Sequence, residues 1–230
     1  MLVILSAGIA PGLALLSYFY LRDQFGQEPV LIVFKTFLLG AILTFPIMFI
    51  QYVIDAEGIF QSDLLSSFLS ASLSEEFFKW FVLFLYVYQH AEFDEPFDGI
   101  VYGASISLGF ATVENIFYLA ANGINFALGR ALLPVSSHAL FGVIMGYYLG
   151  KGKFQYGQNG WKWVFTAFFV PFVLHGLYDY ILVSGKNWIY YILPFMLFLW
   201  WLGLKKVKHA HLMTKEFYNK KLKSRNASIS

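Results

Sequence analysis

Seven segments of this 230-residue chain are each long and apolar enough to cross a lipid bilayer. A transmembrane helix needs about 20 mostly apolar residues. The seven segments lie at about 2–21, 30–54, 66–88, 99–121, 131–150, 163–183 and 188–204. The connections between them are short and rich in charged residues, Gly and Asn. The sequence therefore predicts an all-α fold, a polytopic membrane helix bundle with about seven transmembrane helices.

Composition excludes several other classes of protein. Only 13% of the residues are charged, whereas soluble domains have about 25%, so a soluble monomer, a disordered chain and a nucleic-acid binder are not expected. Aromatic residues make up 20% of the chain, which suits contact with lipid and with the membrane interface. The chain has no Cys, which excludes disulfides, thiolate metal sites and Cys nucleophiles.

The basic residues of the connections predict the orientation of the bundle. If the N-terminus lies outside, twelve Lys and Arg residues are cytoplasmic, four in loops and eight in the tail, and only Arg130 and Lys186 are outside. Cytoplasmic loops carry the excess of positive charge, so we expect the N-terminus out and the C-terminus in. We divide the chain into a transmembrane helical domain, 1–204, and a basic cytoplasmic tail, 205–230, beside the anionic lipid of the inner leaflet.

Ionisable side chains inside the predicted spans are the candidate functional residues. Each such group at a helix centre costs about 2.5–3.5 kcal/mol, so it indicates a functional site. In the predicted topology these groups lie at a similar depth, toward the outside, on four helices. The candidate catalytic residues are Glu75, Glu76, Glu114, His138 and His175, and the candidate supporting residues are Lys79, Asn115 and Asp179.

The helical faces that carry these groups also favour one shared site. His175 and Asp179 are four residues apart and share a face, so Asp179 can orient the imidazole. His138 shares its face with Gly142 and Gly146, and small residues of this kind let membrane helices approach closely. We therefore expect the polar side chains to point into the bundle and away from lipid.

Carboxylates and imidazoles at one site indicate hydrolysis. A carboxylate can act as general base on a water that attacks a peptide carbonyl, while an imidazole or Lys stabilises the oxyanion. A divalent metal such as zinc is an alternative activator of that water, with Glu114, His138 and His175 as possible ligands. Because Glu75 and Glu76 are adjacent, we expect one of them to activate water, Glu75 by preference, and the other to pair with Lys79.

Four motifs resemble one known family. EEFFK at 75–79, FATVEN at 110–115, SHALFG at 137–142 and HGLYD at 175–179 are similar to the PrsW family of bacterial membrane proteases. That family is similar in turn to the CAAX-processing and bacteriocin-immunity proteases, whose pattern is E-E-x-x-x-R, F-x-x-x-H and H-x-x-x-N/D. This chain has Lys79 one position before the Arg of that pattern, Trp80 in the Arg position, and Glu114 in place of the first His.

The resemblance implies a specific activity and location. It implies a multi-pass protein of the bacterial cell membrane that performs site-1 cleavage of a single-pass, membrane-anchored anti-sigma factor on its extracytoplasmic side, in response to envelope stress. The alternative function is an ion-coupled transporter with a carboxylate–His relay. Pro134 and Pro171 interrupt two spans, but the two halves of the chain show no symmetry of the kind that transporters have. A purely structural membrane scaffold is a third alternative.

Overall fold

The structure, a computed structural model, describes residues 1–154 and 160–227, and these contain helices and no β-strand. The predicted connection at 151–162 includes residues 155–159, which lie outside the described part of the chain. The helical elements are α1 (Leu2–Tyr20), α2 (Val30–Ala56), α3 (Asp63–Leu65), η1 (Ser66–Ser72), α4 (Leu73–Val82), η2 (Leu83–Val87), α5 (Asp98–Asn122), η3 (Ile124–Phe126), α6 (Ala127–Arg130), η4 (Ala131–Val135), α7 (Ser136–Phe154), α8 (Gly160–Val183) and α9 (Trp188–Ala227).

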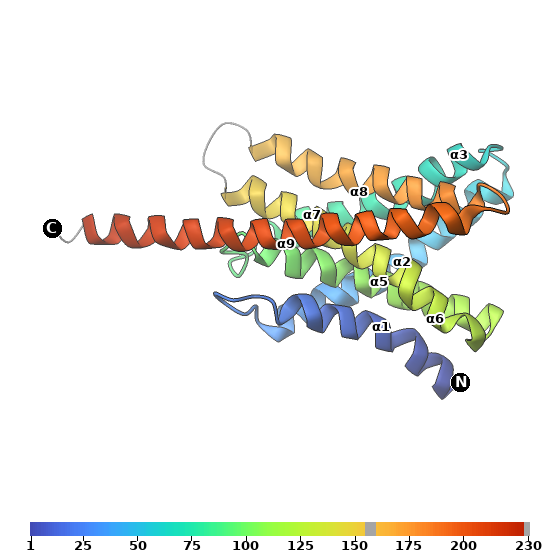
Figure 1. The fold of residues 1–230 in the computed structure, drawn as a ribbon, viewed down its shortest axis with the longest axis horizontal. Helices are drawn as coiled ribbons and strands as arrows, with labels where there is room; N and C mark the ends of the chain where they lie inside the picture. The colour runs from blue at the N-terminus through green and yellow to red at the C-terminus, as the bar shows by residue number, and fades with distance from the viewer. Residues whose placement is uncertain (155–159, 228–230) are drawn as a thin grey trace.

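Seven helical rods form the bundle (Figure 1). Six of them are long and apolar enough to cross a membrane by length and composition. The remaining rod is the unbroken series of α3, η1, α4 and η2, which runs from Asp63 to Val87. The prediction of an all-α polytopic membrane bundle is confirmed.

Two of the predicted helix ranges are wrong at their ends. The fifth span, predicted at 131–150, runs from Ile124 to Phe154, because η3, α6 and η4 continue directly into α7. The seventh helix, predicted to end at 204, continues as α9 to Ala227. The polar residues after 204 are compatible with a helix in water, so loss of apolar character marks where the chain leaves the hydrocarbon and does not mark where the helix ends.

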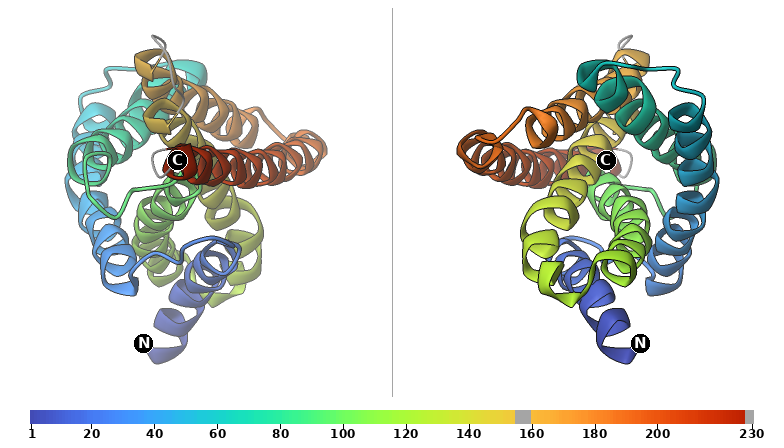
Figure 2. Two further views of the ribbon diagram at one scale, coloured as in Figure 1. Left: turned by 90° about the vertical axis from the view of Figure 1, so that its left-hand side faces the viewer. Right: turned by 90° about the vertical axis from the view of Figure 1, so that its right-hand side faces the viewer.

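Helices α5 and α7 lie in the middle of the bundle (Figure 2) and are its most enclosed spans. They pack together through glycine. A Cβ atom added at Gly103 would collide with the backbone of Gly142, and one added at Gly146 would collide with the backbone of Gly99. The predicted small-residue face below His138 is therefore confirmed, since it allows the two helix backbones to touch.

Two π-helical stretches immediately precede site residues. Segment η1 ends at Ser72, three residues before Glu75, and η4 ends at Val135, three residues before His138. Stretches of this kind change the direction in which the following side chains point and occur often at functional sites. The Ser72 hydroxyl donates to the Phe172 carbonyl at 2.5 Å and so ties this rod to α8.

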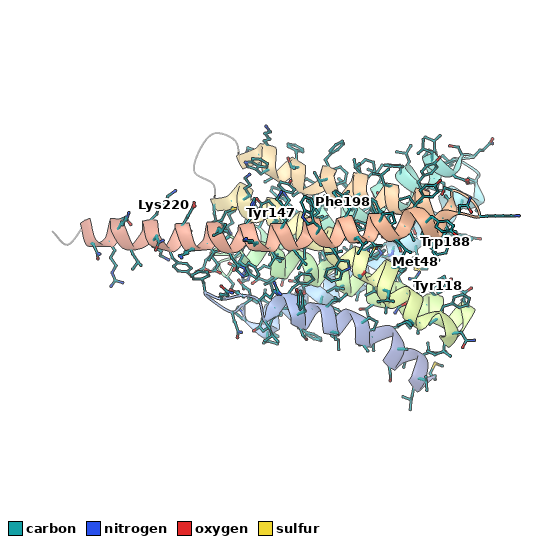
Figure 3. All side chains as sticks on the ribbon, in the orientation of Figure 1. Met48, Tyr118, Tyr147, Trp188, Phe198 and Lys220 are labelled. Carbon is teal, nitrogen blue, oxygen red and sulfur yellow. The ribbon has the colours of Figure 1, made fainter. Side chains whose placement is uncertain are left out.

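The outer faces of the peripheral helices are apolar, as contact with lipid requires. On α2, for example, Phe34, Ile42 and Phe49 are each more than half exposed. Aromatic side chains also lie toward the ends of the bundle: Figure 3 places Tyr118 and Trp188 toward one end. This arrangement fits the usual enrichment of Trp and Tyr at membrane interfaces.

The extension of α9 packs against the loops at the opposite end of the bundle. The Phe97 amide donates to the Thr214 hydroxyl at 3.1 Å, and the ring of Phe97 stacks on His211 with centroids 4.3 Å apart. Phe25 stacks on Tyr218 at 5.6 Å. The loops that follow α1 and precede α5 therefore share one end of the bundle with the basic part of α9.

Candidate active site

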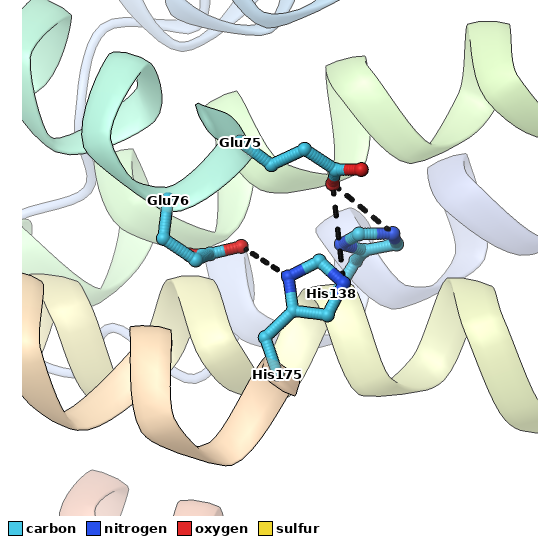
Figure 4. Close-up of side chains that lie close together, drawn as sticks. All are labelled: Glu75, Glu76, His138 and His175. Atoms are coloured by element: carbon cyan, nitrogen blue, oxygen red, sulfur yellow. Dashed lines mark hydrogen bonds and ion pairs between the residues drawn. The ribbon is translucent and has the colours of Figure 1, made fainter. Parts of the chain in front are cut away.

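Side chains from three helical rods meet inside the bundle. Glu75 and Glu76 come from α4, His138 from α7 and His175 from α8 (Figure 4). One nitrogen or oxygen atom of each residue lies within 4.8 Å of those of the others. All four residues are buried. Residues that are up to 100 positions apart in the sequence thus form one polar cluster within the apolar core.

Lys79 lies at the base of this cluster with its side chain fully buried. Its ammonium donates to Glu76 at 2.8 Å and to Glu75 at 3.2 Å, and lies 3.3 Å from Nδ1 of His138. Two of the three N–H donors of the ammonium are taken by the two glutamates. Lys79 positions the other groups and neutralises part of their charge.

The expectation that only one of the two glutamates pairs with Lys79 is wrong. Lys79 follows Glu76 by three residues and Glu75 by four, and both spacings bring side chains together on a helix. The long, flexible side chains of both glutamates therefore reach the ammonium although their Cβ atoms point in different directions. Glu75 has a further partner in Gln51 of α2, whose side-chain amide donates to Oε1, the carboxylate oxygen that does not contact Lys79, at 3.1 Å.

Both imidazoles face the same oxygen of Glu75. The Nε2 atoms of His138 and His175 each lie 4.0 Å from Glu75 Oε2, and the two rings are 5.0 Å apart, nearly perpendicular (Figure 4). The Nδ1 atom of His175 is 2.9 Å from Glu76 Oε1. Glu76 thus holds this ring from behind, and its Nε2 atom is left to face Glu75.

Asp179 contacts His175 from the other side. Its Oδ2 atom lies 3.3 Å from Nε2 of His175. The shared face that the spacing predicts is present, but the carboxylate that fixes the Nδ1 side of the ring is Glu76. Only the tertiary structure shows this division, because Glu76 is on a different helix.

Glu114 and its partners form the more open edge of the site. Glu114 Oε2 lies 3.1 Å from Nε2 of His138, and Glu114 Oε1 accepts a hydrogen bond from Arg130 at 3.0 Å. Arg130 also donates to Asn115 at 3.3 Å, and Asn115 donates to the Gly8 carbonyl of α1 at 3.1 Å. The side chain of Glu114 is 30% exposed, so this edge is accessible from outside the cluster.

Sequence reasoning missed two contributors to this cluster. Arg130 was counted only as a basic residue of an outer loop, but its side chain is 12% exposed and pairs with Glu114. Gln51 was not singled out, although it is a polar residue inside a predicted span, and this was the signal that could have found it. Conversely, Ser136 and Ser137 donate to the backbone carbonyls of Leu132 and Pro134, which gives no support for a serine nucleophile beside His138.

The donor set suits a zinc-type ion. Two imidazole Nε2 atoms face a common region that carboxylate oxygens of Glu75, Glu114 and Asp179 surround. Ligand atoms of tetrahedral zinc, at bonds of about 2.0–2.2 Å, lie about 3.3–3.5 Å apart, slightly closer than the 4.0 Å between Glu75 and either imidazole. The Glu76 carboxylate on Nδ1 of His175 is the outer partner that a metal-ligating His usually has.

The compact group lacks one residue of the predicted ligand set and contains two others. The sequence predicts Glu114, His138 and His175 as ligands, whereas the four residues whose atoms lie within 4.8 Å are Glu75, Glu76, His138 and His175. Glu114 reaches the group through its contact with His138. The donors are oxygen and nitrogen atoms, which suit zinc and other divalent transition metals.

Comparisons with known proteins assign this chain to a family. The family model described as PrsW family intramembrane metalloprotease matches residues 28–202. The protein named Protease PrsW from Bacillus subtilis (strain 168) is 59% identical over 210 residues, which cover 91% of this chain and 96% of the relative. Protease PrsW from Geobacillus kaustophilus (strain HTA426) is also 59% identical, over 91% of this chain and 93% of the relative.

A more distant relative matches over nearly as much of the chain. Protease PrsW from Clostridioides difficile (strain 630) is 33% identical over 84% of this chain and 86% of its own length. No solved structure matches the chain with significance. These names support the predicted protease over the ion-coupled transporter, and the spans place it in a bacterial membrane as a multi-pass protein. The chain therefore belongs to the PrsW family of intramembrane metalloproteases.

Proposed function

We propose that this membrane protease performs site-1 cleavage of a single-pass, membrane-anchored anti-sigma factor on its extracytoplasmic side. The observation that carries the proposal is the position of Glu75 Oε2, which lies 4.0 Å from both imidazole Nε2 atoms in a buried cluster. A carboxylate in this position can take a proton from a water molecule while the imidazoles face the carbonyl that the water attacks.

The place of the cluster along the bundle supports cleavage on the outer side. Glu114 lies eight residues before the end of α5, about 12 Å along a helix axis. Arg130, which pairs with Glu114 at the more open edge of the site, lies at the same end of the bundle. By the positive-inside rule we expect this end to lie outside the cell. The side chains of Glu114 and Asp179 are 30% and 24% exposed, so the cluster is most open along their edge.

The proposed roles follow from the contacts. Glu75 takes a proton from water, and the resulting hydroxide forms a bond to the carbonyl carbon. His138 and His175 stabilise the negative charge on the carbonyl oxygen. The carbon–nitrogen bond then breaks, and Glu75 returns the proton to the leaving nitrogen, which yields a carboxylic acid and an amine.

The remaining charged groups hold these residues in place. Glu76 and Lys79 are fully buried and contact the others at 2.8–3.3 Å, so they act as positioning residues. In the metal-dependent version of the mechanism, His138 and His175, together with Glu114, would hold a divalent ion such as zinc in place of their direct role at the carbonyl oxygen, and Glu75 would stay free as the base. A bound ion of this kind polarises a carbonyl and makes water more acidic.

Reconstitution with a substrate tests the proposal. The chain and a single-pass membrane anti-sigma factor are placed in liposomes, and cleavage is followed with and without a chelator. We expect Glu75→Gln to reduce the rate by about 100-fold or more, the contribution of a general base. Glu57→Gln, the same substitution at an exposed residue after α2, is the matched control. Full activity of Glu75→Gln would refute the mechanism, and cleavage of only unrelated peptides would refute the substrate.

A further inference from the structure

A second group of buried carboxylates lies at the opposite end of the bundle from Arg130. Asp23 and Glu28 belong to the loop between α1 and α2, Glu95 to the loop before α5, and Asp98 is the first residue of α5. They are 6%, 4%, 1% and 0% exposed, respectively. One carboxylate oxygen each of Asp23, Glu95 and Asp98 lies within 4.8 Å of the other two.

Several oxygens of this group are buried without a hydrogen-bond donor. Among the described residues, no hydrogen bond of normal geometry reaches either oxygen of Glu95, Asp23 Oδ2 or Asp98 Oδ1, and the Tyr218 hydroxyl is the polar group near Glu95. A buried polar atom that is left unpaired costs about 1–3 kcal/mol, and more when it is charged. Four such atoms in one small region indicate that something else contacts them in the working protein.

In Asp23 and Asp98, the carboxylate oxygen that accepts hydrogen bonds holds the unpaired oxygen in place. Asp98 Oδ2 accepts the backbone N–H groups of Asp94 and Glu95 at 2.8 and 2.7 Å. Asp23 Oδ1 accepts the N–H of Phe25 at 3.2 Å. Asp23 and Asp98 therefore each have one oxygen fixed by backbone N–H groups of their own loops, and this orients the other oxygen before any ligand binds.

The nearby cationic side chains of Lys153 and Arg22 make their direct contacts with other groups and not with the unpaired carboxylate oxygens. The Lys153 ammonium donates to the His90 carbonyl at 3.4 Å and lies 4.5 Å from the centre of the Phe93 ring. The Arg22 guanidinium lies over the Tyr18 ring at 4.6 Å. Glu28 receives a hydrogen bond from the Tyr102 hydroxyl, which is a neutral partner. The carboxylates thus concentrate negative charge that no side-chain cation contacts directly at the unpaired oxygens.

We propose that Asp23, Glu95 and Asp98 bind one hard divalent cation, Ca²⁺ or Mg²⁺, at the cytoplasmic end of the bundle. Oxygen ligands are what these ions prefer. Three oxygens bound to one calcium ion by bonds of about 2.3–2.6 Å can all lie about 4.0–4.5 Å apart, so a group within 4.8 Å needs to contract by only a few tenths of an ångström. Magnesium, with bonds of about 2.0–2.1 Å and a corresponding separation of about 3.6 Å, requires a larger contraction of up to about 1 Å.

Such an ion would link three parts of the chain. Asp23 lies on one loop, Glu95 on another, and Asp98 begins the central helix α5. The extension of α9 lies against both loops, since His211 contacts the Arg22 carbonyl at 2.6 Å and the Phe97 ring. Binding would therefore fasten the base of α5 to the surface on which the basic part of α9 packs.

The test is a cation titration of the full-length protein in detergent after treatment with a chelator. The background is Glu75→Gln, and hard cations bind imidazole-containing sites poorly, so the intramembrane cluster contributes little. We expect Ca²⁺, and Mg²⁺ at higher concentration, to raise the unfolding temperature by about 5 °C or more at a hundredfold excess over the dissociation constant. Calorimetry should give one equivalent of bound ion.

Variants show whether the ion binds at this group. Glu95→Gln should abolish the shift, whereas Glu92→Gln, the same substitution at an exposed position of the same loop, should keep it. If Glu95→Gln fails to fold, Tb³⁺ luminescence of the parent protein serves instead. The Tyr218 hydroxyl and Glu95 Oε2 both lie 3.9 Å from the Cβ position of Gly26, so Tyr218→Phe should weaken sensitised emission.

Two outcomes would overturn the proposal. The first is an equal shift in Glu95→Gln, which would place the ion elsewhere. The second is no shift with either ion in the parent, which would mean that protons alone neutralise these carboxylates.

Discussion

The Nδ1 atom of His175 lies 2.9 Å from Glu76 Oε1, on a different helix and 99 residues earlier in the chain. The contact fixes the orientation of the ring, so Nε2 faces Glu75 and Asp179. This contact gives the two adjacent glutamates different surroundings. Glu76 supports a ring from behind, and Glu75 faces the reacting side of both rings.

His175→Ala is expected to reduce cleavage far more than Asp179→Asn. The first substitution removes a group that faces the reacting atoms, with an expected loss of about 10²–10⁴-fold. The second keeps an oxygen at the place from which Asp179 contacts Nε2 at 3.3 Å, so the loss should be about 10- to 100-fold. Cleavage rates normalised to the amount of protein in the membrane measure both. An inactive Asp179→Asn beside an active His175→Ala would reverse these roles.

Arg130→Gln should slow cleavage although Arg130 lies at the edge of the site. Its guanidinium donates to Glu114 at 3.0 Å and to Asn115 at 3.3 Å. Loss of a hydrogen bond to a charged group costs about 1.5–3 kcal/mol, which corresponds to about 10- to 100-fold in rate if it is lost in the transition state. The control is Lys186→Gln, at the other predicted outer basic residue, which is exposed. Equal rates for the two variants would show that Arg130 serves only topology.

Gly146→Ala should destabilise the bundle. A Cβ atom there would collide with the backbone of Gly99, which can move only if α5 and α7 separate. Overpacking of this kind typically costs about 1–3 kcal/mol. Gly129→Ala is the matched control because nothing lies within 4 Å of its Cβ position. The thermal unfolding of the two variants in detergent provides the comparison, and a stable Gly146→Ala protein would contradict this packing.

The orientation of the bundle can be tested by cysteine labelling, since the natural chain has no Cys. Position 94 lies in the loop before α5 and position 125 lies in η3, after α5; both are exposed, and the predicted topology places them on opposite sides. A membrane-impermeant reagent added to intact cells should label a cysteine at 125 and should label one at 94 only after the membrane is opened. Labelling of position 94 in intact cells would invert the topology and place the active site toward the cytoplasm.

Without divalent cations, the stability of the protein should fall as the pH rises from about 5 to about 8. Burial is the main cause that raises the pKa of Glu28 and of Glu95 from 4.5 to about 7. Between pH 4.5 and about 7 the folded chain therefore binds more protons than the unfolded chain. The folded state loses the stability that comes from these bound protons as the two carboxyl groups ionise. The ionisable groups that face these two are Asp23, Asp94, Asp98, Tyr102 and Tyr218, with Lys153 and His211 as nearby bases.

The unfolding temperature in the presence of a chelator measures this effect. Glu95→Gln should flatten the pH dependence, and Glu92→Gln should leave it as in the parent. A parent protein whose stability rises over this pH range would show that the carboxyls of this group ionise readily in the folded chain.

The sequence alone predicted the helical membrane bundle and the approximate ranges of most of its spans, and it singled out most of the polar residues that meet in the candidate site. Hydrophobic length predicts spans because the thickness of the bilayer is fixed, and the cost of charge in hydrocarbon makes Glu75, Glu114, His138 and His175 stand out. The glycine face of α7 was also readable, since a spacing of four residues repeats one face of a helix.

Only the tertiary structure decided which of these groups contact one another. That Glu76 holds His175, that both glutamates reach Lys79 and that Arg130 pairs with Glu114 all depend on how separate helices pack. The carboxylates of Asp23, Glu95 and Asp98 looked like ordinary loop residues, because charge in a loop is usually solvated. Their burial follows from the packing of two loops and α9, and no local pattern of residues encodes such a contact.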